Sequence, residues 1–289
     1  MVSAVPVGGR RSMQLRSAVH TVRKRRPTPH DRDGDPELLA LVDEPYVEVA
    51  ETHKRLQDLL AAFEARNDRR AAFLSIYAEM TGAVAQRTFD GGFDHPDWVG
   101  RYLVAFANHY REAVRDYERG DLAELADPWQ LAFDAADAGD SLVIQDVLLG
   151  VNAHINYDLS LAVNKAGVRT DRGPKYVDHS RVTDVIADII DDAQDHLVDE
   201  FGADGLSTID DSLGRLDEQF SVLTIDQCRD SAWRTAVALT SRFTARRRLA
   251  RWINDVTATG AAQLILSTKT SDRLHDTLVE LERSAGDRA

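Results

Sequence analysis

The residues Gly150-Val-Asn-Ala-His-Ile-Asn-Tyr-Asp-Leu159 put polar groups in the middle of an apolar helical pattern. The polar residues discussed below are Asn152, His154, Asn156 and Asp158. Apolar positions continue on both sides, which predicts a buried helix over residues 140–166. Each buried amide, imidazole or carboxylate without a partner costs roughly 1–3 kcal/mol, so these groups must bond to one another, hold an ion or face a cavity. The segment therefore predicts both the central helix of the fold and the location of a site.

The remaining chain repeats the three- and four-residue apolar spacing of amphipathic helices, without strand alternation or hairpin turns. Prolines at first turns and glycines at helix ends mark the boundaries. Helices are predicted over 36–44, 46–68, 69–86, 96–118, 128–138, 178–201, 208–221, 225–244, 246–266 and 271–284. This pattern predicts an all-α fold, a single bundle of about nine to ten helices around the helix over 140–166. Short loops and the absence of a linker predict one domain over residues 36–284.

The charge divides the chain into a basic arm and an acidic body. Residues 1–30 contain seven basic and no acidic residues, whereas the whole chain of 289 residues has a formal net charge of −13. We predict a disordered N-terminal arm over residues 1–35, in which Met13 is an alternative translation start, so residues 1–12 are not assumed to be translated. The body is rich in Asp and Arg, which is typical of proteins from a high-salt cytoplasm.

Charge and hydropathy exclude several classes of protein. No apolar run reaches the roughly 18 residues of a membrane span, and residues 1–30 lack the apolar core of a signal peptide. The acidic body repels nucleic acid, so only the basic arm is a candidate for binding it. The single cysteine, Cys228, excludes an internal disulfide and a cysteine-based zinc site. We therefore expect a soluble, cytoplasmic protein whose candidate partner is a small molecule.

Within the polar segment, two pairs of residues are spaced four apart. His154 and Asp158 share one face of a helix, where they can act as a base with its orienting carboxylate or supply two metal ligands. Asn152 and Asn156 lie on the opposite side and are candidate ligand-binding residues. The alternative is a buried network in which all four side chains bond to neighbouring helices.

Three further residues are candidates outside that segment. His109 lies on an inward, aromatic stripe of its helix, and Tyr77 lies on one face of the helix over 69–86; both are candidate ligand-binding residues. Asp178 is predicted to be the N-cap of the helix over 178–201 and a candidate metal ligand. The complete candidate metal set is His154, Asp158, His109 and Asp178. Trp129 is interpreted as a packing residue.

Two functional hypotheses stay open. In the first, the protein is a metal-dependent enzyme acting on a small molecule, with His154 as base or ligand and Asp158 as its orienter or second ligand. Zn, Mn or Fe suits such a mixed histidine and carboxylate set. In the second, the protein is a non-catalytic ligand-binding or scaffold protein, and its polar helix is a structural network.

The central segment also carries a family resemblance. Residues 150–159, followed by Ala162, are similar to the signature G-[MV]-N-A-H-I-N-x-D-L-x-x-A of an uncharacterised family of all-helical proteins, a domain of unknown function. Shorter stretches beginning at Phe73, Phe106, Trp129 and Asp178 are similar as well. The resemblance extends over residues 45–245 and implies that the four polar residues are hallmark positions. It implies no reaction and no ligand.

Overall fold

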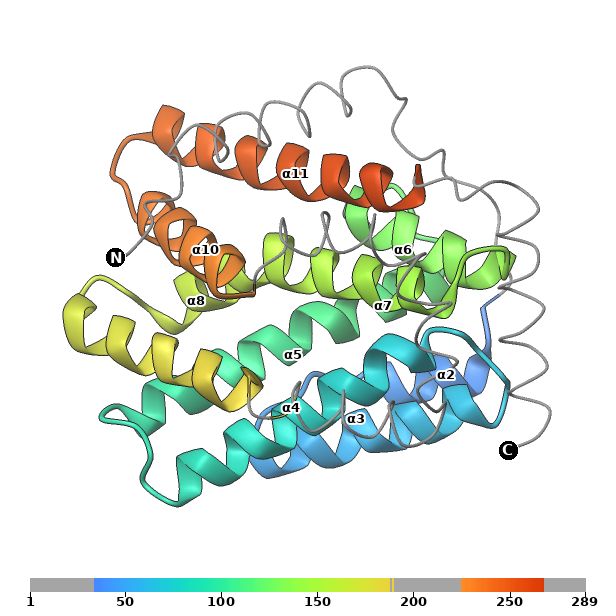
Figure 1. Cartoon of the computed structure of the whole chain (residues 1–289), viewed down its shortest axis with the longest axis horizontal. Coiled ribbons are helices and arrows are strands. Elements are labelled where there is room, and N and C mark those ends of the chain that lie inside the picture. The colour runs from blue at the N-terminus through green and yellow to red at the C-terminus, as the bar shows by residue number, and fades with distance from the viewer. Residues whose placement is uncertain (1–33, 188, 190–224, 268–289) are drawn as a thin grey trace, which may run out of the picture.

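The computed structural model describes residues 34–187, 189 and 225–267, and these residues form helices without strands (Figure 1). The helices are α2 Pro36–Val42, α3 Val49–Glu64, α4 Ala71–Phe89, α5 Pro96–Glu118, α6 Asp127–Ala138, α7 Val143–Val151, η1 Asn152–Asp158, α8 Leu159–Ala166, α10 Ile225–Leu239 and α11 Thr244–Leu266. A further helix covers residues 172–187. Counted with α7, η1 and α8 as one continuous helix, the described residues form nine helices, so the predicted all-α bundle is confirmed.

Several predictions concern residues outside this description. The arm, apart from residues 34 and 35, and the helices over 208–221 and 271–284 lie outside the described residues. The same holds for most of the predicted helix beyond residue 189. Within the described part of the chain, no helix is both long enough and apolar enough to span a membrane.

Local chemistry sets the helix boundaries. The carboxylate of Asp35 caps α2 by accepting from the backbone N–H groups of Glu37 and Leu38 at 2.8 and 3.3 Å. Proline occupies the first turn of α5, where its missing N–H costs no hydrogen bond. Gly139 ends α6 with φ of 66°, a left-handed conformation that glycine adopts without steric cost. These signals place most helix ends within a few residues of the predicted positions.

The central helix differs from the prediction in its middle and at its start. It begins at Val143, after an N-cap at Leu142, rather than at residue 140. Residues 152–158 form a π-helix, in which the N–H of Leu159 donates to the C=O of His154, five residues earlier. In Figure 1 this helix runs between α4 and α5 on one side and α10 and α11 on the other.

The continuous helix joins two hydrophobic cores. Leu149 and Ala153 belong to a core built by α2 to α7 together with the end of α11. Leu159 and Val163 belong to a second core, built by the first half of α5, α8, α10 and the helix over 172–187. Phe106 packs against both cores. The polar segment therefore lies where the two cores meet.

The helix over 172–187 begins six residues earlier than predicted. The Gly-Pro pair at residues 173 and 174 was interpreted as part of a loop, but it lies in the first turn, where proline is tolerated. Asp178 is therefore inside the helix and not its N-cap. Its carboxylate bonds to another element, as described below.

Candidate functional site

The imidazole of His154 is enclosed by aromatic rings from three other helices. Phe106 of α5 stacks on it, with ring centroids 3.5 Å apart and ring planes within 8°. Tyr77 of α4 meets it edge-on at 4.2 Å. The centroids of the remaining rings lie 5.7–6.2 Å away: Phe73 of α4, Tyr110 of α5 and Trp129 of α6. We call these five rings the aromatic box.

Asp158 and Trp129 hold the imidazole in place. His154 Nδ1 lies 3.3 Å from Asp158 Oδ2, and Trp129 Nε1 donates to the same oxygen at 2.8 Å. Burial raises the pKa of Asp158 well above its usual value, although donation from Trp129 lowers it in part. Burial also lowers the pKa of His154 well below its usual value. Both effects favour the neutral forms, so the pair carries no net charge. Trp129 is thus more than the packing residue that we predicted.

The two asparagines face the opposite side of the helix, toward α11. Asn156 Nδ2 donates to Asn152 Oδ1 at 3.0 Å, and Asn152 Nδ2 donates to the C=O of Ala258 at 2.9 Å. Asn254, also on α11, donates through Nδ2 to the C=O of Tyr157 at 2.9 Å. The amides of the segment therefore connect the central helix to the backbone of α11. The sequence contained no signal for Asn254.

Gly150 permits the close approach of α7 and α4. A Cβ atom at this position would lie 2.3 Å from Cγ of Phe73, a distance that no real Cβ contact allows. Phe73 is a wall of the aromatic box, so a glycine is needed for this ring to lie against the helix. A gap of only about 10 Å³ remains there, next to Phe73, Tyr110 and Trp129. This is the volume of a single water molecule at most.

Tyr77 and His109 differ in how they relate to the pair formed by His154 and Asp158. Tyr77 is a wall of the box, and its buried hydroxyl has no hydrogen-bond partner among the described residues. His109 is not part of the box, but its charge contributes to lowering the pKa of His154. Its Nε2 atom is buried without a partner, and its Nδ1 atom lies 3.8 Å from Glu112 Oε2. Burial lowers the pKa of His109.

The four candidate metal ligands do not come together. Asp178, on the helix over 172–187, lies next to the start of α5. There its carboxylate accepts from the backbone N–H groups of Asp94 and His95 at 2.9 and 2.8 Å. This position is about three helical turns from Phe106 and the aromatic box. Among residues 34–187, 189 and 225–267, no group of three or more His, Cys, Asp or Glu side chains is arranged to hold a metal ion.

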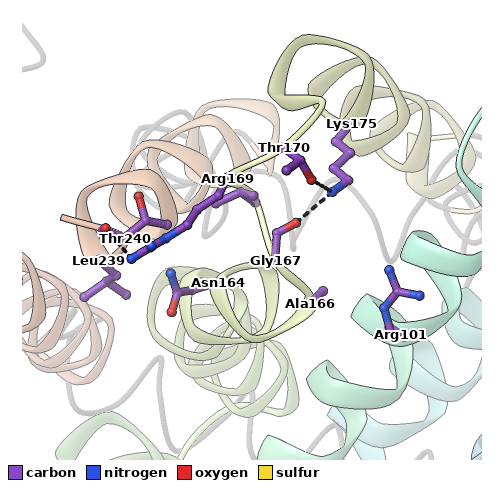
Figure 2. A pocket seen from close by; sticks show the side chains of 10 residues that line it. Arg101, Asn164, Ala166, Gly167, Arg169, Thr170, Lys175, Leu239 and Thr240 are labelled. Atoms are coloured by element: carbon purple, nitrogen blue, oxygen red, sulfur yellow. Dashed lines mark hydrogen bonds between the residues drawn. The ribbon is translucent and has the colours of Figure 1, made fainter. Parts of the chain in front are cut away.

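A pocket of about 390 Å³ lies past the C-terminal end of α8 (Figure 2). Its walls come from α5, the loop after α8, the helix over 172–187 and the end of α10. Residues that line it include Arg101, Asn164, Gly167, Arg169, Lys175 and Thr240. This volume is within the range of small-molecule sites. Sequence reasoning missed the pocket, because its residues are far apart in the chain and belong to no motif.

Three of the lining side chains are cationic and none is acidic. Lys175 is only 7% exposed, and its Nζ donates to the C=O of Gly167 at 3.1 Å and to Thr170 Oγ1 at 3.3 Å. Arg169 Nη2 donates to the C=O of Thr240 at 2.9 Å. The one signal in the sequence was a group of basic residues between positions 167 and 177, within a body that is acidic as a whole.

Comparison with known proteins places the chain by family only. Residues 49–268 match the family described as a family of unknown function, DUF5995. No curated protein and no solved structure matches the chain.

Proposed function

The chain belongs to this family of unknown function, and from the geometry we propose that it is a non-catalytic, small-molecule-binding protein. In this proposal His154, Asp158, Asn152 and Asn156 form a structural network that holds the bundle together. The ligand binds elsewhere, in the pocket past the end of α8. The proposal follows the second of the two hypotheses drawn from the sequence.

One observation carries the proposal: the polar segment is closed, whereas the pocket is open. The box encloses the imidazole of His154, and the adjacent gap of about 10 Å³ has no room for a substrate. A general base must come within hydrogen-bond distance of the proton that it removes. The pocket past α8 offers about 390 Å³ and several polar groups. A ligand can therefore enter the pocket without the displacement of any ring.

The bonding partners of the polar segment also support a structural role. Asp158 bonds to His154 and to Trp129 of α6, and Asn152 bonds to the backbone of α11. These bonds tie the central helix to two neighbours at the junction of the two cores. Hydrogen bonds between buried side chains of neighbouring helices rigidify a core.

The structural role is tested by measuring unfolding free energies in urea. We expect His154→Ala to lower the free energy of unfolding by about 3–5 kcal/mol, because it removes a buried ring and leaves Asp158 without one partner. Asp158→Ala should lower it by a similar amount, because it leaves Trp129 Nε1 and His154 Nδ1 without their shared partner. His53→Ala, on the half-buried surface of α3, is the control and should cost under about 1 kcal/mol. Unchanged stability in both box variants would contradict a structural role.

The binding role is tested by native mass spectrometry after incubation with metabolite mixtures. Ala166→Trp places an indole in the pocket and should abolish ligand binding. Ala245→Trp, on the exposed first turn of α11, makes the same change outside the pocket and should leave binding intact. Ligand retention by Ala166→Trp, or the absence of any bound molecule, would count against this pocket as the binding site.

A second candidate, an enzyme that uses His154, rests on polar atoms that have no partner. Nε2 of His154 and the hydroxyls of Tyr77 and Tyr110 are all buried without hydrogen bonds in the described residues. Unpaired buried polar atoms are rare and call for an explanation, such as a water or an ion. The metal-dependent form of this hypothesis expects stoichiometric Zn, Mn or Fe in the purified protein, lost in His154→Ala without unfolding. Protein that stays metal-free at saturating concentrations of all three ions would rule that form out.

A further inference from the structure

We propose that the pocket past α8 binds the phosphate group of a small phosphorylated molecule, through Arg101, Arg169 and Lys175. This inference rests on the proposed function, because it takes the pocket as the ligand site and specifies the chemistry of the ligand. It is carried by three cations around one cavity whose described lining contains no carboxylate.

Lys175 is the central observation. It is 7% exposed, yet both of its hydrogen bonds go to neutral oxygens, those of Gly167 and Thr170. An ammonium group has three donors, so one proton of Lys175 has no acceptor in the described residues. A buried charge without a counter-charge is unfavourable. An anion in the pocket would supply both the missing acceptor and the missing charge.

The two arginines lie on different walls of the same cavity (Figure 2). Arg169 extends from the loop toward the end of α10, where its one bond to a described residue goes to the C=O of Thr240. Arg101 projects from α5 on the other side and makes no hydrogen bond or ion pair in the described part of the chain. A guanidinium presents a planar set of N–H donors that matches phosphate oxygens in pairs. Both side chains therefore keep donors free for a ligand.

Several other buried or partly buried cations of this protein are paired with carboxylates, although Arg229, which is 2% exposed, bonds to the neutral oxygens of Thr183 and His179. Arg69 bonds to Asp146 at 2.7 Å, and Arg70 bonds to Glu118 at 2.6 Å. Because the whole chain has a net charge of −13, carboxylates are the most abundant charged groups on it. A cavity with three basic and no acidic side chains is therefore a local exception, of the kind that concentrates anionic ligands.

The size of the cavity and its apolar walls indicate more than a bare ion. Ala166, Val168 and Leu239 line the pocket beside the three cations. Mixed linings of this kind are typical of sites in which a charged group fixes the orientation and an apolar part of the ligand packs against the wall. Three positive charges complement a phosphate dianion better than a single carboxylate.

The test is isothermal titration calorimetry of the full chain with inorganic phosphate at low ionic strength. The wild-type protein should bind phosphate, and Arg101→Gln and Lys175→Met should each weaken binding about tenfold. Arg248→Gln is the matched control, because it removes an exposed arginine of α11 that does not line the pocket and makes no hydrogen bond or ion pair in the described residues. Its affinity should equal that of the wild type. Arg101 makes no described bond, so its variant should fold normally.

Absence of phosphate binding, or equal affinity in the wild type and in both pocket variants, would overturn the inference. Acetate that binds as tightly as phosphate would overturn the assignment of a dianion. The proposed function fails separately. If native mass spectrometry finds an uncharged ligand that Ala166→Trp excludes, the pocket is a binding site and only the phosphate assignment is wrong.

Discussion

The π-helical segment lies in the middle of the continuous helix, and the pocket past α8 lies at its C-terminal end. The polar groups of these two regions have opposite environments. In the aromatic box, Asp158 and His154 are neutralised by burial and bond to each other. In the pocket, Lys175 is also buried, with 7% of its surface exposed, but it has no acidic partner among the described residues. The neutral pair contributes to the fold through its bonds within the core, whereas the positive charge of Lys175 is available to an anionic ligand. The difference separates the structural region from the binding region.

The largest effect is expected from opening the box. Phe73 packs against four rings, three from the box and the imidazole of His154. Phe73→Ala should therefore lower the unfolding free energy by about 3–5 kcal/mol through the cavity it leaves. Arg101→Ala, in the pocket, should change it by less than about 0.5 kcal/mol, since this exposed side chain makes no described bond. Urea denaturation followed by circular dichroism measures both. Similar losses in the two variants would remove the distinction between box and pocket.

The next effect concerns the contact of α7 with the box. Gly150→Ala should cost about 1–3 kcal/mol, because the new Cβ atom would lie 2.3 Å from the ring of Phe73. All three of the nearest atoms belong to Phe73, so the cost should fall below about 1 kcal/mol when Phe73→Ala is already present. Gly173→Ala is the control, because no atom lies within 4 Å of its Cβ position. An equal cost of Gly150→Ala in both backgrounds would locate the close contact elsewhere.

The sequence predicted those parts of the molecule that depend on local periodicity. The helix predicted over 96–118 matches α5. A proline marks its first turn, and the amphipathic pattern marks the residues that follow. The i,i+4 pairs His154–Asp158 and Asn152–Asn156 were also predictable, because residues four apart meet on any helix. The π-helical winding was not predictable. The extra bonds that accompany it come from Asn254, about a hundred residues away in the chain.

The partners of the site residues were also not predictable, because they are far away in the sequence. The spacing of Trp129 and Asp158 does not reveal that α6 brings the indole N–H to the carboxylate. Asp178 was assigned to a metal set because its type suited one, but its position inside a helix directs it to the start of α5. The pocket depends on Lys175 and Arg101, which no periodic pattern connects.

The protonation of the box predicts that the stability of the protein depends on pH. In the unfolded chain Asp158 is ionised above about pH 4, whereas in the folded chain burial raises its pKa and keeps it protonated. Above that pH the folded state therefore binds one more proton than the unfolded state. The contribution of Asp158 to the unfolding free energy should fall by about 1.4 kcal/mol per pH unit until its raised pKa is passed.

The measurement is the difference in unfolding free energy between the wild type and Asp158→Asn, taken at intervals from pH 5 to pH 8. Because His154 is present in both proteins, its own titration cancels to a first approximation. The advantage of the wild type should shrink as the pH rises. A difference that stays constant with pH would mean that the carboxylate is ionised in the folded box, as it is in the unfolded chain.

The smallest effect is expected in the pocket, where the sign matters more than the size. Lys175→Met keeps the length and the apolar stem of the side chain but removes a buried charge without an acidic partner. Without phosphate, the variant should be between equal in stability and about 1 kcal/mol more stable than the wild type. The bonds from Nζ to Gly167 and Thr170, at 3.1 and 3.3 Å, are the only stabilisation lost in the described residues.

Saturating phosphate should reverse that order, because a ligand that binds only the folded state raises the free energy of unfolding. The wild type should then become more stable than Lys175→Met, as measured by the midpoint of thermal unfolding with and without phosphate. A loss of more than about 2 kcal/mol in the variant without phosphate would show that the ammonium group holds the loop after α8. Lys175 would then resemble Asp158 in being structural, and the contrast between box and pocket would rest on the two arginines alone.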